Sequence, residues 1–392
     1  MSEFKNLPSG WKVVRLGEIS SRVTRRNQDN RCQNVLTISA QSGLINQVDF
    51  FNKQVASKDL SNYILLKKGE FAYNKSYSTG YSFGAFKRLK FYEEGVASPL
   101  YIYFKFNDDV CSDFFEFYFD AGQANRQIKD IVQEGARNHG LLNLSIDDFF
   151  NIKIRMPNLD EQKKIAEILS TWDEAINLTI NLIESKKQFK KALMQNLLTA
   201  KINWHTTTLS NVGEIITGST PSTTNEKFWN GEVAWITPTD IGDKKDIFIG
   251  ERSITQDGLK ATRELPANSL LVTCIASIGK NAVLKVKGSC NQQINALIPN
   301  KNFNVDFLYY LLEFEKEKLK KLAGITATLI ISKALFSKFK ISFPDITEQQ
   351  KIAEVLMACD DEINLLNLKL ENLKKQKQGL MQKLLSGKVV IW

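Results

Sequence analysis

The chain has 392 residues, a net charge of +9, 43% apolar residues and 24% charged residues, which is ordinary for a globular protein of two or three domains. It contains no run of about eighteen apolar residues that could cross a bilayer, and its first residues lack the layout of a signal peptide. We therefore expect a cytoplasmic protein with no membrane partner.

The five cysteines favour structural thiols over a metal site. They form no Cys-x-x-Cys pair, and neither His139 nor His205 stands at a spacing from a cysteine that suits a tetrahedral metal ion. We expect reduced thiols and no metal bound by this chain.

Residues 1–157 form the first predicted domain. Short β-branched and aromatic runs such as Val35–Ser39 and Leu100–Phe104 predict strands of a mixed sheet with a few helices. The segment carries 21 Lys and Arg against 17 Asp and Glu. This excess makes the domains, rather than the helices that follow them, the predicted site for a polyanion, although it also lies within normal scatter.

Residues 158–203 predict one long helix. Apolar side chains recur at spacings of three and four, which is typical of a coiled-coil seam. The predicted seam is Ile165, Leu169, Trp172, Ile176, Ile183, Leu193 and Leu197. Thr179, Lys186 and Lys190 fall on the same line, and Asp160 is placed to cap the helix. From Ile165 to Leu197 such a helix would span about 48 Å at about 1.5 Å per residue.

Residues 204–344 form the second predicted domain. Runs such as Leu270–Ile275 again predict strands, and the segment carries 17 Lys and Arg against 13 Asp and Glu. Its predicted class is therefore the same as that of the first domain.

Residues 345–392 predict a second long helix. Thr347 and Gln350 fit a capping box at its start, and Gly387 suits its C-terminal cap. Lys377 interrupts the apolar line. The predicted seam is Ile352, Leu356, Ile363, Leu366, Leu370, Leu373, Leu380 and Leu384, with Cys359 on the same line.

The two helices carry an internal repeat. Glu161–Leu169 returns nearly unchanged as Glu348–Leu356, 187 residues later, which indicates duplication of a unit of domain plus helix. We predict an α/β protein of two mixed domains joined by two long helices that form an antiparallel coiled coil. The alternative is that each helix packs on its own domain or on a second copy of the chain.

The repeats and the N-terminus resemble a known family. Leu7–Ile19, the helix entry at Pro157 with Glu161 and Gln162, and its twin from Pro344 are similar to those of specificity subunits of type I restriction-modification systems. The resemblance covers essentially the whole chain, and the helical repeats carry most of it.

The resemblance implies a division of labour among subunits. Each domain would be a target recognition domain that reads one half of a bipartite, asymmetric site in double-stranded DNA. The helices would set the spacer and dock two modification subunits, which methylate adenine, and restriction and translocase subunits would join them. S-adenosylmethionine, ATP and Mg would be bound by those partners, with no cofactor in this chain. About 48 Å of helix compares with roughly fourteen base pairs at about 3.4 Å each.

Catalytic motifs are missing from the sequence. There is no Asn/Asp-Pro-Pro-aromatic tetrapeptide of an amino-methyltransferase and no GxxxxGK[ST] loop, and Ser277–Lys280 is too short for one. Glu161 and Lys163 stand two apart on a helix and face different directions, so they do not form a nuclease site. We interpret Glu161 as a first-turn acid that favours the helix dipole, and we predict a non-catalytic subunit.

Candidate DNA contacts in the first domain combine amide, cationic and aromatic groups beside Gly80, which suits contacts with phosphates and base edges. A solvated hairpin or a polar turn is the alternative interpretation. The candidates are Asn74, Lys75, Ser76, Tyr77, Tyr81, Lys87, Arg88, Arg137, Asn138 and His139.

Candidates in the second domain are mostly hydroxyl and amide side chains. They could equally be satisfied polar residues beside a strand. They are Thr237, Thr239, Ser277, Lys280, Asn291, Gln292, Gln293, Thr326 and Thr328. Because Arg252 and Arg263 are the only arginines of this domain, we expect guanine recognition by arginine to be less important here.

Two other functions remain open from the sequence. The chain could be a scaffold whose domains bind proteins, or the target-reading portion of a fused methyltransferase-nuclease.

Overall fold

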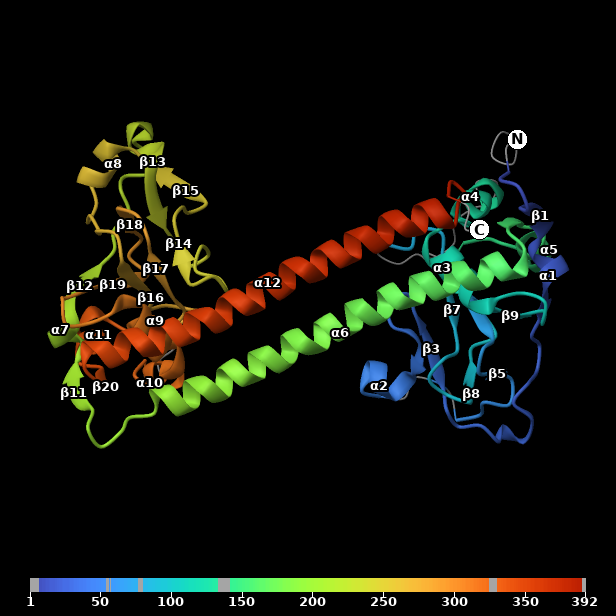
Figure 1. The fold of residues 1–392 in the computed structure, drawn as a ribbon, viewed down its shortest axis with the longest axis horizontal. Coiled ribbons are helices and arrows are strands. Elements are labelled where there is room, and N and C mark those ends of the chain that lie inside the picture. The colour runs from blue at the N-terminus through green and yellow to red at the C-terminus, as the bar shows by residue number, and fades with distance from the viewer. Residues whose placement is uncertain are drawn as a thin grey trace. The chain divides into compact units, whose positions relative to one another are not determined.

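The computed structural model describes residues 7–53, 56, 58–76, 80–132, 142–323 and 330–389. It divides into two compact units, which are treated separately: unit 1 is Met1–Ile180 with Lys369–Trp392, and unit 2 is Asn181–Leu368. Each unit holds one globular domain and a portion of both long helices, α6 (Leu159–Leu198) and α12 (Ile346–Leu384) (Figure 1). No helix in the described ranges is long and apolar enough to cross a membrane.

The domain of unit 1 is built on a four-stranded antiparallel sheet in the order β2-β9-β6-β7, with the pairs β3-β4, β5-β8 and β1-β10 beside it. Its strands are β1 (Lys12–Arg15), β2 (Ser20–Arg22), β3 (Leu36–Ser39), β4 (Gly43–Asn46), β5 (Ile64–Lys67), β6 (Phe71–Asn74), β7 (Ala85–Arg88), β8 (Glu94–Ala97), β9 (Ile102–Phe106) and β10 (Lys153–Met156). Its helices are α1 (Leu16–Ile19), α2 (Gln47–Phe51), α3 (Ser112–Asp120), α4 (Asn125–Val132) and α5 (Ile146–Phe150), with a 3-10 turn at Gln28–Asn30.

Aromatic side chains dominate the core of unit 1. All four residues of β6 are buried, and α3 buries Phe115 and Phe119 among others. Phe86 of β7 stacks on Phe119 with a centroid distance of 3.9 Å. Burial of these large rings therefore fixes α3 against the sheet.

The domain of unit 2 has a five-stranded sheet in the order β12-β19-β16-β17-β14, a three-stranded sheet β15-β13-β18 and the pair β11-β20. Its strands are β11 (His205–Thr208), β12 (Gly213–Thr217), β13 (Trp229–Ile236), β14 (Asp246–Ile247), β15 (Arg252–Ile254), β16 (Ser269–Thr273), β17 (Asn281–Leu284), β18 (Gly288–Cys290), β19 (Ile294–Pro299) and β20 (Lys340–Phe343). Its helices are α7 (Leu209–Val212), α8 (Gln256–Lys260), α9 (Val305–Phe314), α10 (Lys316–Lys321) and α11 (Lys333–Ser337), with a 3-10 turn at Glu226–Phe228.

The core of unit 2 forms between the five-stranded sheet and α9. Every residue of β16 is buried, as expected for a strand covered on both faces. α9 begins at a cap in which the Asn304 side chain accepts a hydrogen bond from the Phe307 backbone N at 2.9 Å. Its buried residues are Phe307, Leu308, Tyr310, Leu311 and Leu312.

The two domains share a scaffold. In each, the first strand pairs antiparallel with the last, β1 with β10 and β11 with β20. A fully buried leucine follows each first strand, Leu16 in unit 1 and Leu209 in unit 2. These features, together with the packing of α6 and α12 described below, confirm the predicted class of two mixed α/β domains with two long helices that pack together.

A buried glutamine attaches each long helix to its domain. Gln162 is fully buried; its Nε2 donates to the Pro157 carbonyl at 2.9 Å, and its Oε1 accepts from the Cys111 backbone N at 3.0 Å. Gln349 repeats both contacts in unit 2, donating to the Pro344 carbonyl at 2.9 Å and accepting from the Asn304 backbone N at 3.0 Å. The repeated Glu-Gln pair in the sequence therefore encodes a docking contact.

The helix caps differ from the predicted ones. The Asn158 side chain accepts from the Glu161 backbone N, and the Asp345 side chain accepts from the Glu348 backbone N, each at 2.9 Å. The predicted caps at Asp160 and at Thr347 with Gln350 are wrong, because α6 begins at Leu159 and α12 at Ile346 and those residues already lie inside the first turn.

The lysines on the predicted seam pair with carboxylates of the facing helix. In unit 1, Lys377 Nζ lies 2.5 Å from Asp173 Oδ1, and in unit 2 Lys190 Nζ lies 2.5 Å from Asp360 Oδ1. The two pairs occupy equivalent positions of the repeat. In unit 2, Lys186 pairs with Glu362 and Lys201 with Glu348, so residue numbers rise along α6 as they fall along α12. The helices therefore run antiparallel within the unit.

None of the predicted seam residues is exposed. Fully or nearly fully buried are Ile165, Leu169, Ile176, Ile183, Ile352, Leu356, Ile363 and Leu384, and half-buried are Trp172, Leu193, Leu197, Leu366, Leu370, Leu373 and Leu380. The first turns also pack into the domain cores: Ile165 and Leu169 join the core of unit 1, and Ile352 and Leu356 that of unit 2. Each helix thus packs both on its own domain and on the other helix.

Candidate nucleic-acid interface

The loop after β6 in unit 1 is shaped by Asn74. Its Nδ2 donates to the Ile38 carbonyl at 3.3 Å, and its Oδ1 accepts from the Ser76 backbone N at 2.8 Å. Asn74 is therefore buried, whereas Lys75 and Ser76 are half-buried at the rim. Its side chain orders the loop rather than projecting from it.

Intramolecular ion pairs occupy the two cations of β7. Lys87 Nζ donates to Asp120 Oδ1 at 2.9 Å and to the Tyr81 hydroxyl at 3.3 Å. Burial opposes its charge, but the contacts with Asp120 and Tyr81 prevail and raise the pKa of Lys87. Arg88 pairs with Asp113. A phosphate would have to displace these carboxylates, so Lys75, Ser76 and Tyr81, which are half-buried and lie outside these ion pairs, are the stronger candidates of this domain.

Six of the predicted contacts lie outside the described residues. They are Tyr77, Arg137, Asn138, His139, Thr326 and Thr328.

In unit 2 the structure brings two predicted segments together. The Asn291 backbone N donates to the Ile236 carbonyl at 2.9 Å, which places the turn before β19 against the Thr237–Asp240 turn. The Thr237 hydroxyl donates to Asp240 Oδ2 at 2.7 Å, and Thr239 is exposed. A polar surface therefore forms where β13 ends.

The amide side chains of this surface differ in their exposure to solvent. Asn291 is buried; its Nδ2 donates to Gln293 Oε1 at 3.1 Å and its Oδ1 accepts from the Gln293 backbone N. Gln292 is exposed, and its Oε1 accepts from the Thr220 hydroxyl at 2.5 Å. Asn291 and Gln293 order the turn, and Gln292 faces solvent.

Thr220 belongs to a hydroxyl-rich loop that sequence reasoning missed. Residues 218–224 follow β12 and read Gly-Ser-Thr-Pro-Ser-Thr-Thr. Thr220 joins the surface defined above through its contact with Gln292, and Ser222 and Thr224 of the same loop are also exposed. The high proportion of Ser and Thr in residues 218–224 is the sequence signal that could have identified this loop.

Ser277 and Lys280 lie in the turn between β16 and β17. This turn adjoins α10, and Lys316 and Lys320 line with it a pocket of about 380 Å³. Three lysines around one turn suit a phosphate group, although Lys316 and Lys320 also contact Glu313 and Glu317.

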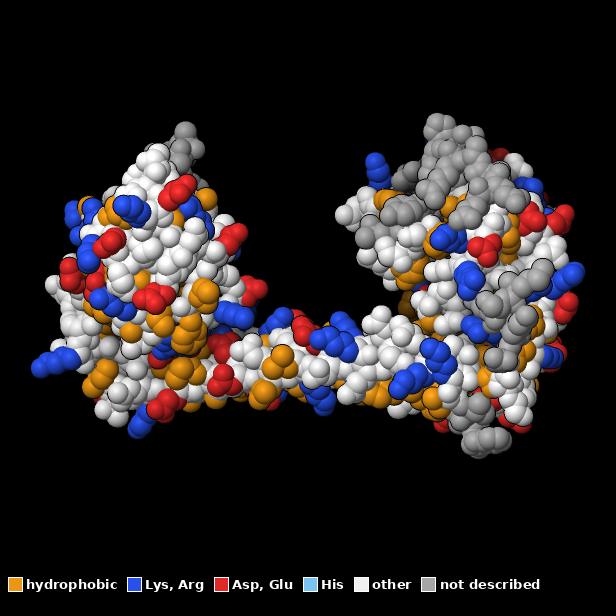
Figure 2. Space-filling model, turned by 90° about the horizontal axis from the view of Figure 1, so that it is seen from above, with side chains coloured by type: hydrophobic (Ala, Val, Ile, Leu, Met, Phe, Trp, Pro, Cys, Tyr) orange, Lys and Arg blue, Asp and Glu red, His pale blue; other side chains and the backbone are white. Residues whose placement is uncertain are grey.

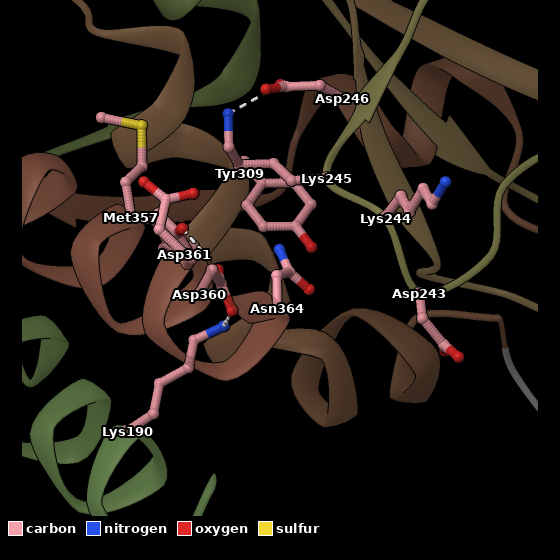
Figure 3. Close-up of a pocket in the computed structure, with 11 residues that line it drawn as sticks. Lys190, Asp243, Lys244, Lys245, Asp246, Tyr309, Met357, Asp360, Asp361 and Asn364 are labelled. Carbon is pink, nitrogen blue, oxygen red and sulfur yellow. Dashed lines mark hydrogen bonds and ion pairs between the residues drawn. The ribbon is translucent and has the colours of Figure 1, made fainter. Parts of the chain in front are cut away.

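A polar cavity of about 420 Å³ lies where the domain of unit 2 meets α6 and α12. Figure 3 shows Lys190 pointing to Asp360, with Tyr309 nearby and Lys245 pointing to Asp246. The Tyr310 hydroxyl donates to Asp360 Oδ2 at 2.6 Å, and burial together with this carboxylate raises the pKa of Tyr310. Lysine and carboxylate side chains line the cavity together and pair with one another, so we interpret it as a structural contact between the domain and the two helices.

Charges of both signs are mixed over the face of the molecule that Figure 2 shows. In the view of Figure 2, Lys and Arg side chains are interspersed with Asp and Glu on the domains and on the helices. On this face, the described residues form no single basic patch that would steer a polyanion.

Burial accounts for the state of two thiols. It raises the pKa of both Cys274 and Cys290 to about 12, so they stay protonated at neutral pH. All five cysteines are free. The described part of the chain contains no group of three or more His, Cys, Asp or Glu that could hold a metal ion.

Two domains with one scaffold and different polar surfaces, each continuous with a long helix, define a protein built from a duplicated unit of domain plus helix. The sequence model of the type I restriction modification DNA specificity domain matches residues 8–185 and 201–375. The chain therefore belongs to that family, as a specificity subunit with two such domains.

Similarity to individual proteins agrees with this membership. The MjaIX specificity subunit of Methanocaldococcus jannaschii is 35% identical over 45% of this chain, and the match spans only 41% of that protein's length. The HindI specificity subunit of Haemophilus influenzae is 24% identical over 86% of this chain and 90% of its own length. The solved HsdS subunit from Thermoanaerobacter tengcongensis has the same fold, with a TM-score of 0.56 at 17% identity over 99% of this chain and 100% of that one.

Proposed function

We propose that this chain reads a bipartite, asymmetric target in double-stranded DNA, with one half-site bound by each domain. The observation that carries this proposal is the combination of a shared scaffold and different surfaces. Gln162 and Gln349 dock equivalent helices in equivalent ways, whereas unit 1 presents Lys75, Ser76 and Tyr81 and unit 2 presents hydroxyls and Gln292. Two different surfaces require two different half-sites.

The candidate contacts act through side chains that combine donors and acceptors. Exposed hydroxyl and amide groups such as Thr239 and Gln292 suit base edges, and Lys280 suits a phosphate. Good bidentate base contacts each supply about 1–3 kcal/mol of discrimination.

We further propose that two modification subunits dock on the helices, one at Leu178 and one at Leu365. These leucines occupy equivalent positions of the repeat and are 61% and 67% exposed. A large exposed apolar side chain on each copy of a duplicated helix favours a partner that binds twice. Because the exposed positions are equivalent, the two partners are copies of one protein.

Replacement of either leucine by lysine tests this docking. Leu178→Lys or Leu365→Lys alone should reduce the stoichiometry from two modification subunits to one in native mass spectrometry, and the double variant should bind none. Leu335→Lys is the matched control, because Leu335 is also exposed but lies on α11. Unchanged stoichiometry in the double variant would disprove the site.

The chain's proposed role is binding without catalysis. The sequence lacks both the amino-methyltransferase tetrapeptide and the nucleotide-binding loop. Methylation with S-adenosylmethionine would therefore be performed by the modification subunits, and ATP and Mg would be used by restriction and translocase subunits. Since the proposed target is cellular DNA, we place the complex in the cytoplasm.

The deciding experiment is single-molecule sequencing of modified bases in the source strain with the gene intact and deleted. Loss of one two-part motif on deletion would support the proposal and give both half-sites and the spacer. Exchange of residues 204–344 for those of a relative should then change one half-site only. If no motif depends on the gene and DNA binding by the complex lacks a salt dependence, the protein-binding scaffold is the better account.

A further inference from the structure

The two arginines of the second domain are used differently. Arg263 Nη1 donates to the Thr217 carbonyl at 2.6 Å, and its backbone N donates to Ser219 Oγ at 3.0 Å, so Arg263 holds the hydroxyl-rich loop. Arg252, the first residue of β15, is exposed. Within the described ranges, its guanidinium has no hydrogen bond or ion pair. Its charge is therefore available to a ligand.

Two tryptophans hold the Arg252 side chain in place. Its guanidinium carbon lies 3.7 Å from the ring centroid of Trp229 and 5.6 Å from that of Trp235. The two indoles pack edge to face with centroids 5.0 Å apart. Stacking on an indole fixes the plane of a guanidinium while leaving its N–H donors free.

The indoles are themselves fixed. Trp229 Nε1 donates to the Ser222 carbonyl and Trp235 Nε1 to the Ser219 carbonyl, each at 3.1 Å. Trp235 is also the partner of Arg252 in the β13-β15 register. The arginine therefore stands on a rigid support that includes the hydroxyl-rich loop, at the end of the domain where Figure 1 shows β13, β15 and α8, away from α12.

The Asp240 carboxylate orders the segment before Arg252, and both of its oxygens accept hydrogen bonds from other residues. Asp240 Oδ1 accepts from the Glu251 backbone N at 2.7 Å, and its Oδ2 accepts from Thr237. Arg252 thus adjoins the same polar surface as Thr237 and Gln292. A fixed guanidinium that has no ion pair among the described residues and lies beside hydroxyl and amide groups is the arrangement expected for recognition of a base edge.

We propose that Arg252 recognises a guanine in the half-site bound by the second domain, through bidentate hydrogen bonds to O6 and N7. This inference rests on the proposed DNA-reading function and revises the expectation that arginine contributes little in this half. A phosphate can also accept both donors of a guanidinium fork. Guanine is favoured because Arg252 adjoins hydroxyl and amide side chains that suit base edges, whereas exposed lysines of this domain, such as Lys280, already supply cations for phosphates. The ordering of the side chain in advance lowers the entropic cost of binding.

The test uses the complete complex with modification subunits and duplexes that carry its motif. Each guanine of the second half-site is replaced in turn by 7-deazaguanine, which lacks the N7 acceptor. One of these base replacements should weaken binding by the complex without protein substitutions roughly ten-fold or more. Arg252→Ala should bind the natural duplex less tightly by a similar factor and be insensitive to that same replacement. Arg252→Lys, which keeps the charge, should behave like Arg252→Ala.

Several outcomes would overturn the proposal. The first is a second half-site without guanine. The second is equal sensitivity of the variants and of the complex without substitutions to 7-deazaguanine at every guanine. The third is a loss of affinity that is uniform across duplexes, with a salt slope reduced by about one, which indicates a phosphate contact. Lys260→Ala provides the phosphate-type control, because Lys260 is exposed on α8. The first half-site is the internal control for folding. If no methylated motif depends on the chain at all, the proposed function itself fails and this inference fails with it.

Discussion

Replacement of Gln349 by alanine tests how the long helices are attached to the domains. The side chain is 1% exposed and connects α12 to the segment that begins α9. Its Nε2 donates to the carbonyls of Pro344 and Asn302, and its Oε1 accepts from the backbone N of Asn304, the residue that caps α9. Truncation leaves the Pro344 carbonyl and the Asn304 backbone N–H without this partner, removes the weaker contact with Asn302 and opens a cavity. A buried polar group without a partner costs about 1–3 kcal/mol, so we expect a loss of roughly 2–4 kcal/mol for the two groups.

The measurement is urea unfolding of the chain followed by tryptophan fluorescence. With a slope of about 1–3 kcal/mol per molar urea, the midpoint of the affected transition should fall by roughly 1 M or more. Gln350→Ala is the matched control, because Gln350 is the same residue type one position further on but is exposed. Its substitution should change stability by less than about 0.5 kcal/mol.

The same substitution has a positional consequence. Gln349→Ala loosens α9 and the domain of unit 2, so methylation should weaken through the second half-site, while Gln162→Ala should act through the first. Equal midpoints for Gln349→Ala and Gln350→Ala would refute the docking role of this glutamine. A common loss at both half-sites would refute its confinement to one domain.

The remaining predictions concern the helix pair, the thiols and one glycine. Lys377→Asp places two acids together on the seam and should lower the free energy of unfolding by roughly 1–2 kcal/mol; the upper bound of about 4 kcal/mol is reduced because Asp173 is partly exposed. The double variant Lys377→Asp, Asp173→Lys should recover most of this loss, and a double variant that recovers nothing would argue against the pairing. Burial raises the pKa of Cys274 and Cys290 from 9.0 to about 12. Between these two pH values the unfolded chain loses the thiol protons while the folded chain keeps them, so the free energy of unfolding should fall as the pH rises from about 9 to about 12. Rapid reaction of these two thiols with a thiol reagent in the native chain at pH 8 would contradict their burial. Gly84→Ala should destabilise unit 1 by more than about 1 kcal/mol in the same urea assay, because Gly84 has φ +81° and an added Cβ would lie 2.5 Å from the Asn74 carbonyl oxygen; an unchanged midpoint would show that the turn relaxes.

The sequence by itself determined the duplication, the two long helices and their antiparallel partnership. Each of these depends on a periodic pattern along the chain: Glu161–Leu169 recurs, and apolar residues such as Ile165 and Leu169 keep a helical spacing. Periodicity is a local property, so it survives without knowledge of which surfaces meet. The starts of the helices were less predictable, because a shift of one or two residues moves the cap from Asp160 to Asn158.

Tertiary structure alone decided how the polar residues are used. Lys190 and Lys377 interrupt the seam in the sequence, and only the facing helix supplies the aspartates that accommodate them. Lys87 and Arg88 resemble DNA contacts in sequence but face Asp120 and Asp113. Arg252, which lacked a signal of its own, packs on two indoles and has no ion pair among the described residues. A charged side chain acquires its role from its partners, and those partners lie far away in the sequence.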